Sequence, residues 1–293
     1  MTMNLMSVFT FALKRATAER RMVMLLYAIN LLLAAVLALA FRSVLISAFG
    51  STMATSGLME GLNFNTLTEL LLKHGAEVGA VFNQIVWYVL LYMIINTLLA
   101  GGILTTLREK ETRFTVREFF AGCGIYFFRF FRLFLLFGIL LIILAFVWMA
   151  VLGVLFNAVT AEGSSEIPYI VWAIVILILF FIPLMVLLVI ADYTKVSTVL
   201  SNTHAMVRAA WRSTKFVFRN FLRVIGLQLL MLLVPIVLFL IYLWLDLTIG
   251  MTTVTTLLVM FVIQQIFVVS RVWTRVFFFS GELELYNSLQ SSR

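Results

Sequence analysis

Six long apolar runs constrain this chain more than any other feature of its sequence. Each run has about the 20 residues that an α-helix needs to cross the hydrocarbon layer of a membrane. The runs cover residues 22–41, 81–107, 133–156, 168–191, 224–245 and 251–270. Within lipid a chain satisfies its backbone polar groups only as helices or as a closed barrel, and runs of this length favour helices. The sequence therefore predicts an all-α integral membrane protein, a bundle of six transmembrane helices.

The composition supports this interpretation. Of the 293 residues, 63% are hydrophobic and 12% are charged, whereas a soluble domain has about 45–50% and about 25%. With so few charges the chain cannot cover its surface with polar groups, so much of its exterior must contact lipid. Only three prolines occur and no Gly/Ser-rich run marks a linker, so we expect one polytopic membrane domain over residues 1–293.

The distribution of charge predicts how the chain is threaded. Six spans put both termini and the segments 108–132 and 192–223 on one side of the membrane. That side holds 19 of the 21 Lys and Arg residues and 7 of the 13 Asp and Glu residues. Loops rich in Lys and Arg stay in the cytoplasm. We therefore expect a multi-pass protein whose two termini are both cytoplasmic.

The segment 192–223, between the fourth and fifth runs, carries the clearest charge pattern. Arg208, Arg212, Lys215 and Arg219 recur at spacings of four, three and four, which places them on one face of a helix. Ser201 or Thr203 is expected to cap this helix. We predict an interfacial amphipathic helix on the cytoplasmic surface, and the basic residues before the first run predict a second one there.

Two interpretations of these basic segments stay open. A second aromatic-rich segment contains Arg129 and Arg132. Each cation near an anionic leaflet gains about 1 kcal/mol, and aromatic rings favour the headgroup region. The segments are either structural anchors that fix helix depth or a docking face for anionic headgroups or a protein partner. Because the interface alone explains the aromatic residues, we do not expect a nucleic-acid partner.

Polar residues inside the apolar runs are costly and therefore informative. Asn96, Gln228 and Gln264 are expected to make hydrogen bonds between helices, with Gly101 and Gly102 allowing close helix contact near Asn96. The alternative is that the amides line a transport path. At the membrane boundary we expect Asp192 to pair with Arg271.

The sequence contains no recognisable catalytic motif. There is no HExxH, GxSxG or Walker lysine loop, and Cys123 is the only cysteine, so no cysteine cluster can hold a metal. We therefore expect a non-enzymatic protein without a cofactor or a bound metal.

At residues 96–102 (NTLLAGG) and 192–196 (DYTKV) the chain resembles a broad set of bacterial six-span inner-membrane proteins. It is similar to the membrane domain found with some glycerophosphodiester phosphodiesterases. The catalytic domain of those enzymes is not in this sequence, so the resemblance carries over no catalytic residue. It implies a location in the bacterial cytoplasmic membrane.

Two functions are compatible with these features. We expect a protein that supports membrane organisation or a partner complex, with a protein partner or a second copy of the chain as candidate partners besides lipid. The alternative is a permease or the transmembrane subunit of a transporter, which would need a polar cavity lined by Asn96, Gln228 and Gln264. An intramembrane enzyme ranks third, because it needs a carboxylate or histidine cluster that we do not find in the sequence.

Overall fold

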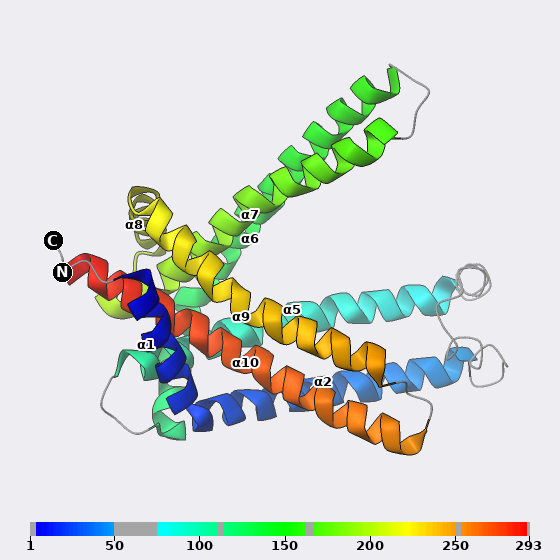
Figure 1. Cartoon of the computed structure of the whole chain (residues 1–293), viewed down its shortest axis with the longest axis horizontal. Helices are drawn as coiled ribbons and strands as arrows, with labels where there is room; N and C mark the ends of the chain where they lie inside the picture. Colours follow the sequence, from blue (N-terminus) through cyan, green and yellow to red (C-terminus); the bar gives the residue numbers. More distant parts are fainter. Residues whose placement is uncertain (1–3, 50–74, 110–113, 162–166, 250–252, 292–293) are drawn as a thin grey trace. The chain divides into compact units, whose positions relative to one another are not determined.

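The computed structural model describes residues 4–49, 75–109, 114–161, 167–249 and 253–291, and in this part the chain forms helices and no strand (Figure 1). The helices are α1 (Leu5–Ala18), α2 (Arg20–Phe49), α5 (Gly75–Arg108), α6 (Val116–Ala161), α7 (Ile167–Ser201), α8 (Met206–Arg219), α9 (Phe221–Thr248) and α10 (Val254–Ser291). Within the described ranges, six of them are long and apolar enough to cross a membrane, namely α2, α5, α6, α7, α9 and α10. The all-helical, six-span prediction is confirmed at this level.

Two helices are much longer than the predicted spans. α6 has 46 residues and α10 has 38. At about 1.5 Å per residue, α6 is roughly 69 Å long, more than twice the ~30 Å of the hydrocarbon layer. The predicted cytoplasmic residues 116–132 are the first part of α6, because no proline interrupts the chain between them and the third apolar run.

The described residues group into two compact units, one of residues 1–23 and 97–293 and the other of residues 24–96. In the smaller unit, the Asn30 side chain donates to the Leu26 carbonyl at 2.9 Å, and the Tyr88 and Tyr92 rings stack. In the larger unit, α1 packs on α9 and α10, while α7 packs on α6, α8 and α10.

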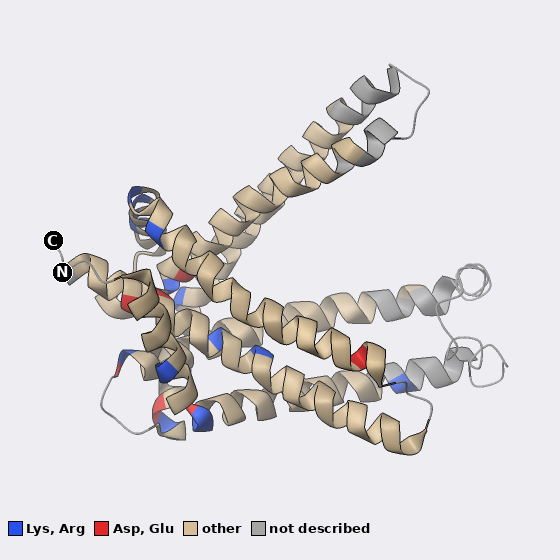
Figure 2. Cartoon of the chain, in the orientation of Figure 1, with Lys and Arg blue, Asp and Glu red and all other residues tan. Residues whose placement is uncertain are grey.

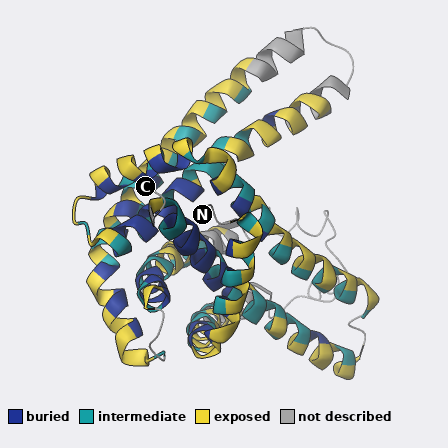
Figure 3. Cartoon of the chain, turned by 60° about the vertical axis from the view of Figure 1, so that its left-hand side comes forward, coloured by how far each residue is buried: buried dark blue, intermediate teal, exposed yellow. Residues whose placement is uncertain are grey.

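The core of the larger unit is built around α10, which packs on α1 and on α7, while α8 packs on α7. Figure 3 colours the buried residues dark blue. α10 contributes apolar side chains at spacings of four, three, four and three, all buried: Val272, Val276, Phe279, Leu283 and Tyr286. α1 buries Val8, Ala12 and Ala16, and its Phe9 ring meets the Phe277 ring edge-on at 5.5 Å. The apolar face of α1 was expected to lie on the membrane interface, but it is buried against protein.

The end of α5 and the start of α6 approach closely through glycine. A Cβ on Gly102 would lie 2.6 Å from the Cys123 Sγ and 2.7 Å from the Phe119 carbonyl oxygen. A Cβ on Gly101 would lie 2.9 Å from the Gly122 carbonyl oxygen. These helices can therefore pack at this distance only without side chains here, which confirms the close contact predicted at Gly101 and Gly102.

Candidate functional site

The face of α8 that points away from the core is strongly basic. Met206, Ala209, Ser213, Phe216 and Val217 are buried, because α8 packs on α7. The exposed side carries Arg208, Arg212, Lys215 and Arg219, and α8 contains no acidic residue. Figure 2 shows these cations together on α8. The periodicity seen in the sequence is therefore a physical face, held in a fixed orientation by the buried one.

The start of α8 differs from the prediction. Ala205 occupies the N-cap position, and no side chain caps the helix. Ser201 is the last residue of α7 and bonds the Ser197 carbonyl, while its hydroxyl and that of Thr203 lie in hydrogen-bond contact. The expectation that Ser201 or Thr203 caps this helix was wrong, because both lie before the turn where α8 begins.

Arg129 of α6 holds the connection between α7 and α8. Its guanidinium donates to the Asn202 Oδ1 at 2.6 Å and to the His204 Nε2 at 2.9 Å. The same group lies over the Tyr126 ring, 5.3 Å from its centroid. Asn202 has a φ of 48°, which asparagine adopts more readily than most residues. Arg129, expected to contact lipid or a partner, is thus engaged with its own protein.

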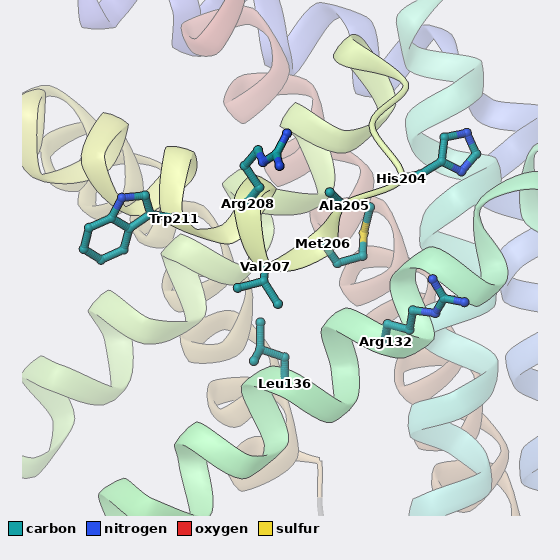
Figure 4. A pocket seen from close by; sticks show the side chains of 8 residues that line it. All are labelled: Arg132, Leu136, His204, Ala205, Met206, Val207, Arg208 and Trp211. Atoms are coloured by element: carbon teal, nitrogen blue, oxygen red, sulfur yellow. The ribbon is translucent and has the colours of Figure 1, made fainter.

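Beside this connection lies a surface groove of ≈ 820 Å³, here called the α6–α8 groove (Figure 4). It is lined by Arg132, Leu136, His204, Ala205, Met206, Val207, Arg208 and Trp211. Arg132 comes from α6 and Arg208 from α8, and both are exposed. Neither has an acidic partner within the part of the chain that the structure describes. Leu136, Met206 and Val207 give the same groove an apolar wall, so it is amphipathic.

A second polar cluster is buried in the core and was missed by sequence reasoning. Glu282 of α10 is 1% exposed, and neither of its carboxylate oxygens has a hydrogen-bond partner among the described residues. The buried Tyr193 hydroxyl is likewise unpartnered in that part of the chain. The signal that could have found Glu282 is the apolar spacing of residues 272–286, which continues well beyond the predicted sixth span.

Asp192 has a different partner from the one expected. Its carboxylate pairs with the Lys195 ammonium at 2.7 Å, and no ion pair joins it to Arg271 within the described ranges. A lysine three residues further along α7 lies on the same helix face. This local partner satisfies the carboxylate without an ion pair to Arg271.

Two of the three intramembrane amides, Gln228 and Gln264, are also placed differently from the prediction. The Asn96 side chain donates to the Tyr92 carbonyl of its own helix at 2.9 Å. Gln228 and Gln264 are half-buried, and neither side chain hydrogen-bonds to another residue in the described part of the chain. The expected hydrogen bonds between helices are therefore not formed there by the two glutamines.

Neither the protein-family models, nor the curated proteins, nor the solved structures give a match to this chain. In the described residues, no group of three His, Cys, Asp or Glu side chains could hold a metal ion. The resemblance to bacterial six-span proteins stays a prediction, and function is argued from the basic face of α8 and the α6–α8 groove.

Proposed function

We propose that this chain is a multi-pass protein of the bacterial cytoplasmic membrane that docks anionic lipid of the cytoplasmic leaflet with the basic face of α8. Both termini lie in the cytoplasm. Docking would hold the protein, or a complex built on it, at an anionic region of the membrane, without a catalytic step. The observation that carries this proposal is the exposed row of Arg208, Arg212, Lys215 and Arg219 opposite a buried face.

The magnitudes favour lipid as the ligand. At about 1 kcal/mol per cation near an anionic surface, four cations supply up to about 4 kcal/mol, reduced by salt screening. Trp211 and Phe218 of the same helix are 62% and 60% exposed. Such rings favour the headgroup region, and the Lys215 ammonium lies 5.3 Å from the centroid of the Trp211 ring. Because α8 packs on α7, the helix presents its basic face in the same orientation before any lipid binds.

The proposal is tested by thermal unfolding in nanodiscs. The full-length protein is reconstituted in phosphatidylcholine alone and in phosphatidylcholine mixed with phosphatidylglycerol. We expect phosphatidylglycerol to raise the unfolding midpoint of the wild-type protein. Most of this increase should disappear in the variant that has glutamine at positions 208, 212, 215 and 219. Added salt should weaken the wild-type effect.

A matched variant controls for total charge. Changing four other exposed basic residues to glutamine removes the same number of charges: Lys14, Arg21, Arg117 and Arg223. This control should keep the larger part of the phosphatidylglycerol effect. If both variants lose it equally, the α8 face has no special role, and the simple anchor interpretation is preferred.

The permease alternative stays a prediction. It needs a polar cavity lined by Asn96, Gln228 and Gln264, whereas the groove described above is lined by residues of α6, α8 and the connection before α8. Lipid docking is preferred because it uses the charged and aromatic residues that line this surface.

A further inference from the structure

We propose that the α6–α8 groove binds the headgroup of a single anionic phospholipid, with Arg132 and Arg208 as its cationic residues. This inference rests on the docking function above and narrows it to one site. A cationic face attracts many lipids at once, whereas the groove would retain one lipid in a defined position.

The groove arginines differ from the neighbouring arginines in their hydrogen bonds within the protein. Arg129 is committed to Asn202 and His204, and the Arg212 guanidinium reaches the Thr203 hydroxyl at 3.4 Å. Arg132 and Arg208 line the groove from two helices and have no acidic partner in the described residues. Guanidinium groups bind phosphate oxygens through paired N–H donors. Two such groups line the same groove, so its charge is complementary to that of a phosphate.

The start of α8 adds positive charge to the same groove. Ala205 provides no side-chain cap, and the first turn contains no acidic residue. The uncapped N–H groups at a helix start carry a partial positive charge that favours anions. Because residues 204–208 line the groove, this contribution acts at the place where the two arginines do.

The apolar wall identifies the anion as a lipid headgroup and not a free phosphate. Leu136 follows Arg132 by one turn of α6, and Val207 is 71% exposed beside Arg208. Farther along α6, Ile139, Leu140 and Ile143 are exposed as well. This apolar surface leads from the groove into the membrane-spanning part of α6, as an acyl chain requires. The groove volume of ≈ 820 Å³ lies within the ~300–1,000 Å³ of small-molecule sites.

The test is native mass spectrometry of the full-length protein, released from detergent after titration with phosphatidylglycerol. We expect the wild-type protein to retain one phosphatidylglycerol and the Arg132→Gln/Arg208→Gln variant to need at least tenfold more lipid for the same occupancy. The matched variant Arg117→Gln/Arg223→Gln removes the same charge from two exposed arginines outside α8 and should keep wild-type retention. The pair Arg132→Lys/Arg208→Lys keeps the charge without the paired donors and should retain lipid at an intermediate level.

A second pair of variants tests the apolar wall. Val207→Glu places a carboxylate in the groove and should abolish retention, whereas Ile125→Glu, at a similarly exposed position of α6, should not. If the Arg132→Gln/Arg208→Gln variant has a lower unfolding midpoint than wild type in phosphatidylcholine nanodiscs, its loss of lipid could reflect unfolding. The comparison of this second pair then tests the groove in its place. Excess inorganic phosphate should leave the bound lipid in place.

Three results would overturn the single-lipid site. The first is an equal loss of lipid retention in the groove variant Arg132→Gln/Arg208→Gln and in its matched control. The second is equal retention of phosphatidylcholine and phosphatidylglycerol by the wild-type protein. The third is displacement of the bound lipid by inorganic phosphate alone. The nanodisc experiment keeps the two proposals apart. If the fourfold α8 variant loses its stabilisation by phosphatidylglycerol while the two arginine pairs retain lipid equally, only the groove inference fails.

Discussion

At the scale of single residues, Glu282 is a costly side chain for this fold. A buried carboxyl group without hydrogen-bond partners is unfavourable, and both oxygens of Glu282 lack a hydrogen-bond partner in the described part of the chain. Lys195 is already paired with Asp192, so removing Glu282 creates no new unpaired charge. We expect Glu282→Leu to stabilise the protein by about 1–4 kcal/mol, seen as a higher unfolding midpoint in detergent.

The control for this prediction is Glu118→Leu, which removes an exposed carboxylate of α6 and should change stability by less than about 0.5 kcal/mol. A lower midpoint for Glu282→Leu would mean that the carboxylate has a stabilising partner in the folded protein. A gain in stability would instead mark Glu282 as a residue whose presence needs a functional reason.

At the scale of helices, the contact between α5 and α6 depends on glycine. The Cβ of Gly102→Ala would lie 2.7 Å from the backbone oxygen of Phe119, and backbone cannot move aside as a flexible side chain can. We expect this substitution to destabilise the protein by about 1–3 kcal/mol, measured by thermal unfolding. Gly124→Ala, two residues from Gly122, meets nothing within 4 Å and should be neutral or slightly stabilising. Equal effects would contradict the close contact.

The helices are also the level at which the sequence predicted most of the fold. Length and hydropathy predict a span because lipid allows the backbone few conformations, so the six helices that are long and apolar enough to cross a membrane were predicted correctly. The spacing of Arg208, Arg212, Lys215 and Arg219 identified one face of α8 for a similar reason.

The partners of individual side chains were harder to predict. Asp192 pairs with Lys195 instead of the expected Arg271, a local contact that helix spacing could have indicated. Arg129 binds the connection at Asn202, 73 residues away in the sequence, a contact that only the three-dimensional fold decides. The α6–α8 groove could not be predicted, since it joins residues about 70 positions apart.

At the scale of the whole molecule, both proposals require α8 to face the cytoplasm. α9 tests this requirement, because Arg223 and Thr248 lie near its two ends, 25 residues or roughly 37 Å apart, and both are exposed. Cys123 is the only cysteine and is buried, so Cys123→Ala gives a background for Arg223→Cys and Thr248→Cys. A membrane-impermeant maleimide should label the Thr248→Cys protein in intact cells and the Arg223→Cys protein only after permeabilisation. The reverse pattern would place α8 outside the cell, where the proposed leaflet is absent, and both lipid proposals would fail together.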